Sequence, residues 1–138
     1  MPKIQLELLH SPPPKMLVIH LGANDLCTVS TGKLYWSMKM NLQHFINLLP
    51  STRVVFSALM PRKVWRGAIS VKAIEQKRKH INFRIHGRMS YNNEGKFIDH
   101  KDISVDNPDV WFVDGVHLSD TGSDFFLADF RRAIEELD

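Results

Sequence analysis

Two stretches of apolar residues have the length and composition of buried β-strands. The first runs from Met16 to Leu21 and stops at Gly22, and the second, residues 53–58, is rich in β-branched residues and precedes Pro61. Short apolar runs bounded by Gly or Pro are typical of strands that are covered on both faces of a parallel sheet. Residues 97–98, which follow the turn signal at residues 92–95, indicate a short third strand.

Between and after these strands the apolar residues recur every three or four positions, which predicts helices. One helix begins at Ser30 or Thr31 and ends before Pro50, and its buried face comprises Leu34, Met38, Leu42, Phe45 and Leu49. A second helix is expected over residues 68–88, with Val71, Ile74, Ile81 and Ile85 on one face. Near the N-terminus, residues 4–9 fit the last turns of an amphipathic helix or a short strand.

A last helix is predicted after Ser119 or Asp120, either of which can cap it. Its apolar face comprises Phe126, Phe130, Ala133 or Ile134, and Leu137. The alternation of strands and helices predicts a single α/β domain over residues 1–138 with a mostly parallel sheet. In such sheets ligands bind beyond the carboxyl ends of the strands, where residues 22–25, 57–61 and 114–117 fall.

Composition narrows the classes of protein that fit. The chain of 138 residues is 43% hydrophobic with a net charge of +3, which indicates a folded domain. A single cysteine, Cys27, rules out an internal disulfide and multi-cysteine zinc sites. The seven histidines include no pair at i,i+4, so we expect no metal and no cofactor. We also expect no membrane span and no signal peptide, hence a cytoplasmic or nuclear protein.

Charge is distributed unevenly along the sequence. Residues 62–88 carry nine basic side chains and a single acidic one, Glu75, whereas residues 94–138 carry twelve acidic and four basic side chains. Either the two segments face one another, or one face of the molecule is positive enough to attract anions.

The segment Gly22-Ala23-Asn24-Asp25 directly follows the first strand. Gly22 permits a tight turn, and the Asn24 side-chain amide is a neutral donor suited to an oxyanion. The same residues also fit an Asx turn, in which Asn and Asp bind nearby backbone groups.

The segment Asp114-Gly115-Val116-His117 can hold a general base. A carboxylate three residues before an imidazole can accept from one ring nitrogen and leave the other free to take a proton. A surface loop in which Asp114 caps the backbone is the alternative interpretation.

In this order, the two segments resemble the SGNH (GDSL-type) hydrolase superfamily. Residues 18–25 look like its block of a strand followed by Gly-x-Asn-Asp, and residues 114–122 are similar to its Asp-x-x-His block before the last helix. The resemblance implies a three-layer α/β/α sandwich of flavodoxin-like strand order and ester hydrolysis by acyl transfer. His117 would be the general base, Asp114 its partner and Asn24 an oxyanion-hole donor, with Gly22 supporting the turn.

Two parts of the family's site have no counterpart in the sequence. The nucleophilic serine of the Gly-Asp-Ser block and the oxyanion glycine of the next block are absent, and so are the first strands of the sheet. Ser57 lacks the flanking glycine of a sharp turn, and Ser119 fits a helix cap. We identify no nucleophile and expect a partial domain that does not hydrolyse a small acyl ester alone.

Two further expectations concern partners, and a third concerns Cys27. Without the family's first strand, the edge of residues 16–21 is unpaired, which predicts a homodimer or aggregate through that edge. The basic helix at residues 68–88 could bind nucleic acid, which is the alternative to the hydrolase interpretation as a non-enzymatic binding protein. Cys27 is expected to be a small buried apolar residue rather than a thiol nucleophile.

Overall fold

The computed structural model describes residues 7, 10–91 and 95–136. Its three strands, β1 (Met16–Ile19), β2 (Arg53–Ser57) and β3 (Gly95–Ile98), form an all-parallel sheet in the order β1-β2-β3. The longer helices are α2 (Thr31–Leu48), α3 (Val71–Tyr91) and α4 (Asp120–Glu135), and the short 3-10 helices are η1 (Ala23–Asp25) and η2 (Pro108–Val110). Among these helices none is long and apolar enough to span a membrane.

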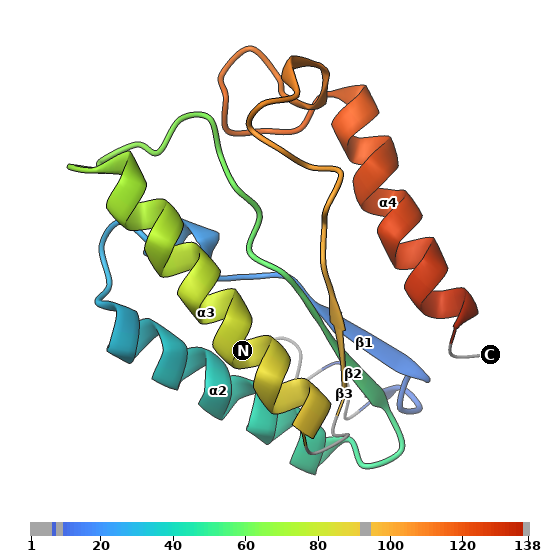
Figure 1. Ribbon diagram of the computed structural model, residues 1–138. Coiled ribbons are helices and arrows are strands. Elements are labelled where there is room, and N and C mark those ends of the chain that lie inside the picture. Colours follow the sequence, from blue (N-terminus) through green and yellow to red (C-terminus); the bar gives the residue numbers. More distant parts are fainter. Residues whose placement is uncertain (1–6, 8–9, 92–94, 137–138) are drawn as a thin grey trace.

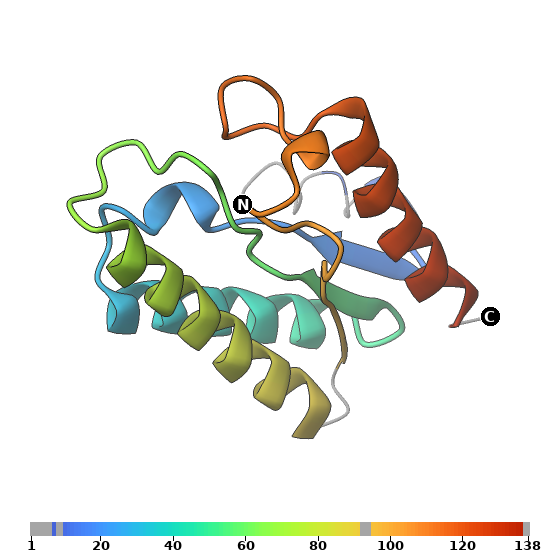
Figure 2. The ribbon, with the colours of Figure 1, turned by 45° about the horizontal axis from the view of Figure 1, so that its top comes forward.

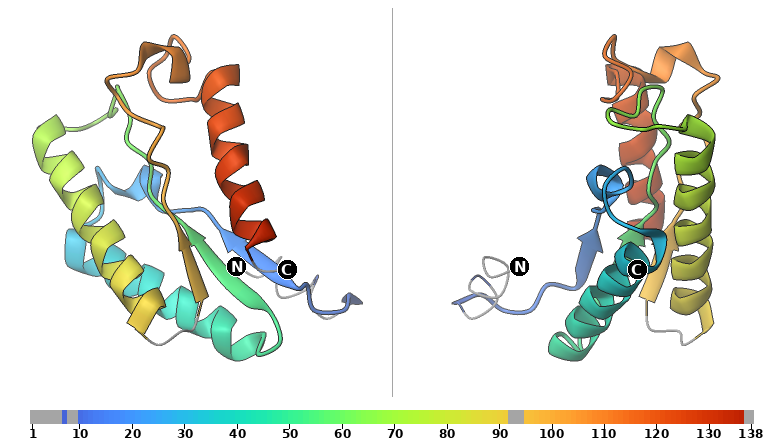
Figure 3. Two further views of the ribbon diagram at one scale, coloured as in Figure 1. Left: turned by 45° about the vertical axis from the view of Figure 1, so that its right-hand side comes forward. Right: turned by 90° about the vertical axis from the view of Figure 1, so that its left-hand side faces the viewer.

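The helices form two layers with the sheet between them, a three-layer α/β/α sandwich as expected (Figure 1). Helices α2 and α3 cover one face and α4 covers the other, which Figure 2 and Figure 3 show from further directions. Alternation along β2 explains the layers, since Val54 and Phe56 pack with α2 and α3 while Val55 packs with Ala133 of α4. The central strand is therefore buried on both faces, as its continuous apolar run predicts.

Strand β1 is less buried than the sequence predicted. The strand ends at Ile19, although the apolar run continues to Leu21, which is exposed. Within the strand, three residues are only half-buried, namely Met16, Leu17 and Val18. The reason is its position at the edge of the sheet, where within the described residues only β2 pairs with it.

Helix α3 begins three residues later than predicted. Ser70 caps it, because its hydroxyl accepts a hydrogen bond from the Ala73 N–H at 3.2 Å. Val71, which was predicted to be on the buried face, lies in this first turn and is exposed, whereas Ile81 and Ile85 are fully buried. On α4 the buried apolar residue is Ala133 rather than Ile134.

Three sequence expectations lie wholly or partly outside the described residues. Most of the segment 4–9, most of the turn at 92–95, and Leu137 belong to the parts of the chain that the structure does not describe. The helices of the basic and acidic segments, α3 and α4, cover opposite faces of the sheet (Figure 1). Outside these helices the two segments meet, because the Val64 N–H donates to the Gly115 carbonyl at 3.0 Å.

The free edge of β1 leads to a prediction about association. The carbonyl of Lys15 accepts from the Arg53 N–H at 2.9 Å, so the backbone groups of Lys15 face β2. Because successive residues of a strand direct their backbone groups to opposite edges, those of Met16 face outward. We expect the chain to associate through this edge, and Met16→Pro, which removes an outward N–H at the first residue of the strand, to give a monomer.

Light scattering over a range of protein concentrations measures this association. Met16→Ala is the matched control, since it loses the same side chain but keeps the N–H, and it should associate as the original chain does. A concentration-independent monomer for the unmodified chain would show that the edge does not mediate association.

Candidate active site

The loop that carries His117 is a small hairpin. Trp111 and Leu118 form an antiparallel bridge, and the Phe112 N–H donates to the His117 carbonyl at 2.9 Å. Gly115 closes the turn with a φ of 67°, in the left-handed region that favours glycine. The hairpin therefore fixes the backbone on both sides of the Asp-x-x-His segment.

Asp114 performs both of the roles that the sequence left open. One carboxylate oxygen accepts from the backbone N–H groups of Val116 and His117, each at 2.9 Å. The other lies 2.5 Å from His117 Nδ1. These hydrogen bonds, the one from the His117 ring first, hold the pKa of the Asp114 carboxyl well below its ordinary value. An ionised Asp114 keeps the hydrogen of His117 on Nδ1 and leaves Nε2 as the basic nitrogen.

Asn24 lies in η1, immediately after the turn at Gly22. Gly22 adopts a φ of 102°, and an added Cβ would lie only 3.3 Å from the Met38 sulfur. The Arg62 guanidinium donates to Asn24 Oδ1 at 2.9 Å. Since the oxygen of the amide is occupied by Arg62 and no described residue accepts from Nδ2, this NH₂ group is the part of Asn24 that can donate to a ligand.

One crevice brings the two sequence segments together. A cavity of about 530 Å³ is lined by His20, Asn24, Arg62 and His117, with apolar side chains that include Met60, Trp111, Leu118 and Phe126. A neighbouring cavity of about 310 Å³ shares Asn24, Arg62 and His117 and adds Cys27, Trp65 and Arg66. The crevice therefore combines a base, an amide donor and an apolar wall at the carboxyl end of the sheet.

The residues that sequence analysis considered as nucleophiles are not hydrogen-bonded to the His117 ring. Ser57 is fully buried and binds other histidines, and Ser119 caps α4 by accepting from the Gly122 N–H at 3.1 Å. Cys27 is half-buried and packs against the main core, so it is less buried than expected. Among the described residues, no hydroxyl or thiol is hydrogen-bonded to His117 Nε2, although Ser123 lines the same crevice.

No group of three potential metal ligands occurs among the residues that the structure describes.

Sequence analysis missed two residues that line the crevice, Arg62 and His20. His20 directly follows β1, and this position after a strand end is the signal that could have identified it. Arg62 lies beyond Pro61, after β2 has ended at Ser57, where no such signal marks it.

Most of the basic side chains of α3 are engaged within the protein. Lys77 donates to the carbonyls of Leu26 and Val29, and Arg78 pairs with Glu75 at 2.8 Å. The Arg84 guanidinium lies 3.6 Å from the centre of the Tyr35 ring. These contacts give the charges a structural role, and nucleic-acid binding by this helix stays a prediction that draws mainly on the exposed Lys72 and Lys79.

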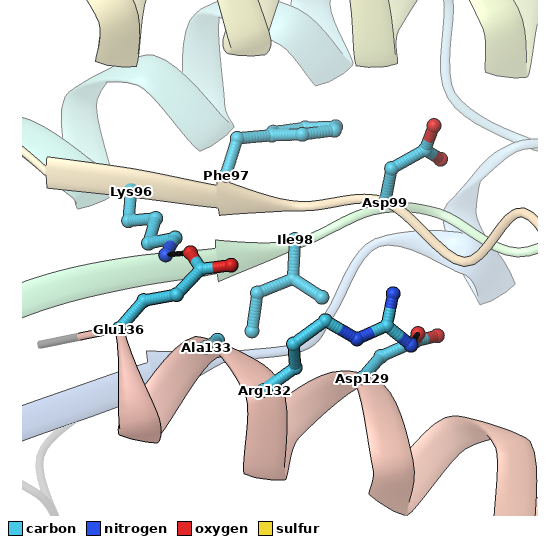
Figure 4. A pocket seen from close by; sticks show the side chains of 8 residues that line it. All are labelled: Lys96, Phe97, Ile98, Asp99, Asp129, Arg132, Ala133 and Glu136. Carbon is cyan, nitrogen blue, oxygen red and sulfur yellow. Dashed lines mark hydrogen bonds and ion pairs between the residues drawn. The ribbon is translucent and has the colours of Figure 1, made fainter.

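A shallow pocket of about 140 Å³ lies between β3 and α4, away from the hairpin (Figure 4). Two ion pairs border it, Lys96 with Glu136 and Arg132 with Asp129. In Figure 4, Ile98 points toward α4 while Phe97 and Asp99 point the other way. The pocket shares no lining residue with the crevice.

Comparison with known proteins places the fold. No protein-family model matches the chain, and no curated protein matches its sequence. The chain is similar to the solved structure of a candidate acylhydrolase from Bacteroides fragilis, with a TM-score of 0.75 and 19% identity over 90% of this chain. It is equally similar to a GDSL-like lipase from Bacteroides thetaiotaomicron, with a TM-score of 0.75 and 21% identity over 91% of this chain.

These likenesses confirm the fold that the two sequence segments implied. The architecture is that of the GDSL-like hydrolases. The chain spans 62% and 64% of the lengths of the two solved proteins, so about a third of each has no counterpart in it.

Proposed function

We propose that this chain forms the base and oxyanion part of an ester-hydrolysing site that acts by acyl transfer. The observation that carries the proposal is the common crevice of Asn24 and a His117 paired with Asp114, in a fold shared with GDSL-like hydrolases. His117 Nε2 would take the proton of the attacking hydroxyl, and Asn24 Nδ2 would donate to the carbonyl oxygen as it becomes negative.

The hydroxyl nucleophile is the part that this chain does not supply. The sequence contains no Gly-Asp-Ser segment, and no described hydroxyl is hydrogen-bonded to His117. In a serine protease, loss of the nucleophile lowers turnover about 10⁶-fold, so the chain by itself should show no acyl-enzyme chemistry.

An added alcohol can replace the absent serine in a test. With 4-nitrophenyl acetate and methanol, His117 would remove the methanol proton, the methanol oxygen would attack the carbonyl, and nitrophenolate would leave as methyl acetate forms. The proton then passes from His117 to the solvent. We expect the protein to raise the ratio of methyl acetate to acetate above that of the solution reaction, and His117→Ala to abolish the increase. Gas chromatography measures both products.

Three further variants test whether the increase in methyl acetate comes from the proposed site. His80→Ala removes an exposed imidazole of α3 and controls for unspecific catalysis by histidine, so it should behave as the original chain does. Asn24→Ala should reduce the increase about 100-fold or more, to background. If Ser123→Ala abolished the reaction, Ser123 would be a nucleophile and the claim that this chain lacks one would be wrong. An equal product ratio for all proteins would contradict the proposed site.

A further inference from the structure

A chain of four polar side chains connects the crevice to the interior beneath α4. His20 Nδ1 lies 2.9 Å from Ser57 Oγ, which lies 2.7 Å from His100 Nε2. His100 Nδ1 in turn lies 2.8 Å from a carboxylate oxygen of Asp129 on α4. Ser57, His100 and Asp129 are all buried, whereas His20 lines the crevice. None of these four residues belongs to the pair formed by the general base His117 and its carboxylate partner Asp114.

The strands place these side chains on one face of the sheet. Met16 and Val18 of β1 pack under α4, and His20 continues the same alternation. Val55 of β2 and Ile98 of β3 belong to the same cluster, and Ser57 and His100 continue the alternation at and after the ends of these strands. The rings of Phe126 and Phe130, from α4, lie 4.8 and 5.8 Å from the ring of the buried His100.

With His100 neutral, the carboxylate at the buried end sets the direction of each hydrogen bond. An ionised Asp129 can only accept, so His100 then carries its hydrogen on Nδ1 and accepts at Nε2. Ser57 then donates its hydroxyl hydrogen to His100, and its oxygen accepts from His20. His20 must therefore carry its hydrogen on Nδ1, and Nε2 is the nitrogen with a free lone pair.

Electrostatics favour the neutral form of His20. Burial of the ring lowers the pKa of His20, a charge on His100 would lower it further, a hydrogen bond with the Ser57 backbone raises it in part, and Arg62 lowers it slightly. The groups that face His20 are thus Ser57 from β2, His100 after β3, Arg62 after β2 and the ring of Phe126 from α4, 5.2 Å away. Beside Arg62 a cationic ligand is disfavoured, so Nε2 suits a neutral donor, of which a hydroxyl group is the one that an ester ligand can carry on its alcohol.

We propose that His20 is a hydrogen-bond acceptor of the crevice, held by the buried Ser57–His100–Asp129 chain, and that it binds a hydroxyl group next to the ester of the ligand. Ser57, His100 and Asp129 are positioning residues, because they act on the ligand only through His20. The ligand is an ester only if the proposed function holds, whereas the state of His20 is independent of it. The crevice accordingly favours esters of alcohols that carry further hydroxyl groups.

Nitrogen-15 NMR of the histidine rings at pH 8 tests the hydrogen bonds between His20, Ser57, His100 and Asp129 without any activity measurement. We expect His20 to carry its hydrogen on Nδ1, and Ser57→Ala to shift it to Nε2, the form that histidine prefers in water. Ser57→Thr keeps a hydroxyl and should preserve the original form, and His117, held by Asp114, should be unchanged in both variants. A hydrogen on Nε2 of His20 in the unmodified chain, or no response to Ser57→Ala, would overturn the proposal.

Binding of two matched esters tests the ligand class. Glycerol 1-acetate carries two hydroxyl groups that propyl acetate lacks, and both fit a cavity of about 530 Å³. We expect glycerol 1-acetate to shift the His20 Nε2 resonance and to bind roughly three- to tenfold more tightly, the difference that one neutral hydrogen bond makes. Equal affinities would refute hydroxyl recognition, and a failed methanol reaction with these NMR results intact would refute only the proposed function.

Discussion

Asp129→Ala is expected to lower the free energy of unfolding by about 3 kcal/mol, because it removes the acceptor of a buried imidazole. Asp129 is 7% and His100 5% exposed, so the hydrogen bond that the substitution removes is a buried one. The variant leaves His100 Nδ1 unpaired between the Phe126 and Phe130 rings. Urea denaturation followed by circular dichroism measures the change, with an unaltered dependence on urea as the sign of a simple loss of stability.

Asp124→Ala is the matched control, since Asp124 lies on the same helix but is exposed. Its effect should stay within about 0.5 kcal/mol. The double variant His100→Phe with Asp129→Leu removes both members of the pair, and we expect it to lose less stability than Asp129→Ala alone. If Asp129→Ala were as stable as Asp124→Ala, the buried hydrogen bond would not exist in solution.

Gly122→Ala is expected to cost about 3 kcal/mol or more and to displace the hairpin that carries His117. An added Cβ would lie 2.2 Å from the Val110 carbonyl oxygen and 3.2 Å from Leu118 Cβ. The first contact is with backbone, which cannot rotate away, so α4 and η2 would have to separate. Thermal unfolding measures the loss of stability, and the NMR signals of His117 report the displacement of the hairpin.

Gly87→Ala provides the contrasting control for this prediction. Gly87 lies within α3, and nothing comes within 4 Å of an added Cβ. Alanine is the better helix former, so this variant should gain about 0.5–1 kcal/mol. A Gly122→Ala protein as stable as Gly87→Ala would show that α4 does not approach η2 as closely as described.

The sequence predicted the elements whose apolar spacing is long and regular. The helix that begins at Thr31 and the one that ends at Glu135 were predicted with the correct starts, because Ser30 and Ser119 precede long amphipathic segments. The sequence analysis overestimated the burial of β1, and it started α3 three residues too early. The spacing of apolar residues gives the face of an element, but it does not show whether a neighbouring strand is present to cover it.

The sequence singled out Asn24, Asp114 and His117 from two short segments, because each places a donor or a base directly after or before a regular element. The structure places Asn24 and His117 in one crevice and pairs His117 with Asp114, and their catalytic roles stay a prediction. Arg62, which orients the Asn24 amide, was not singled out, because nothing in its neighbourhood distinguishes it from the other basic residues of its segment.

The sequence by itself determined the order of strands and helices, the fold class and the pairing of Asp114 with His117, because these depend on residues that are neighbours along the chain. Only the tertiary structure decided which charges meet and which histidines face the crevice. The contact of His20, Ser57, His100 and Asp129 joins three strand ends to a helix across 109 residues of sequence. Such a contact depends on the register of the strands and the packing of α4, which are three-dimensional properties that local patterns do not encode.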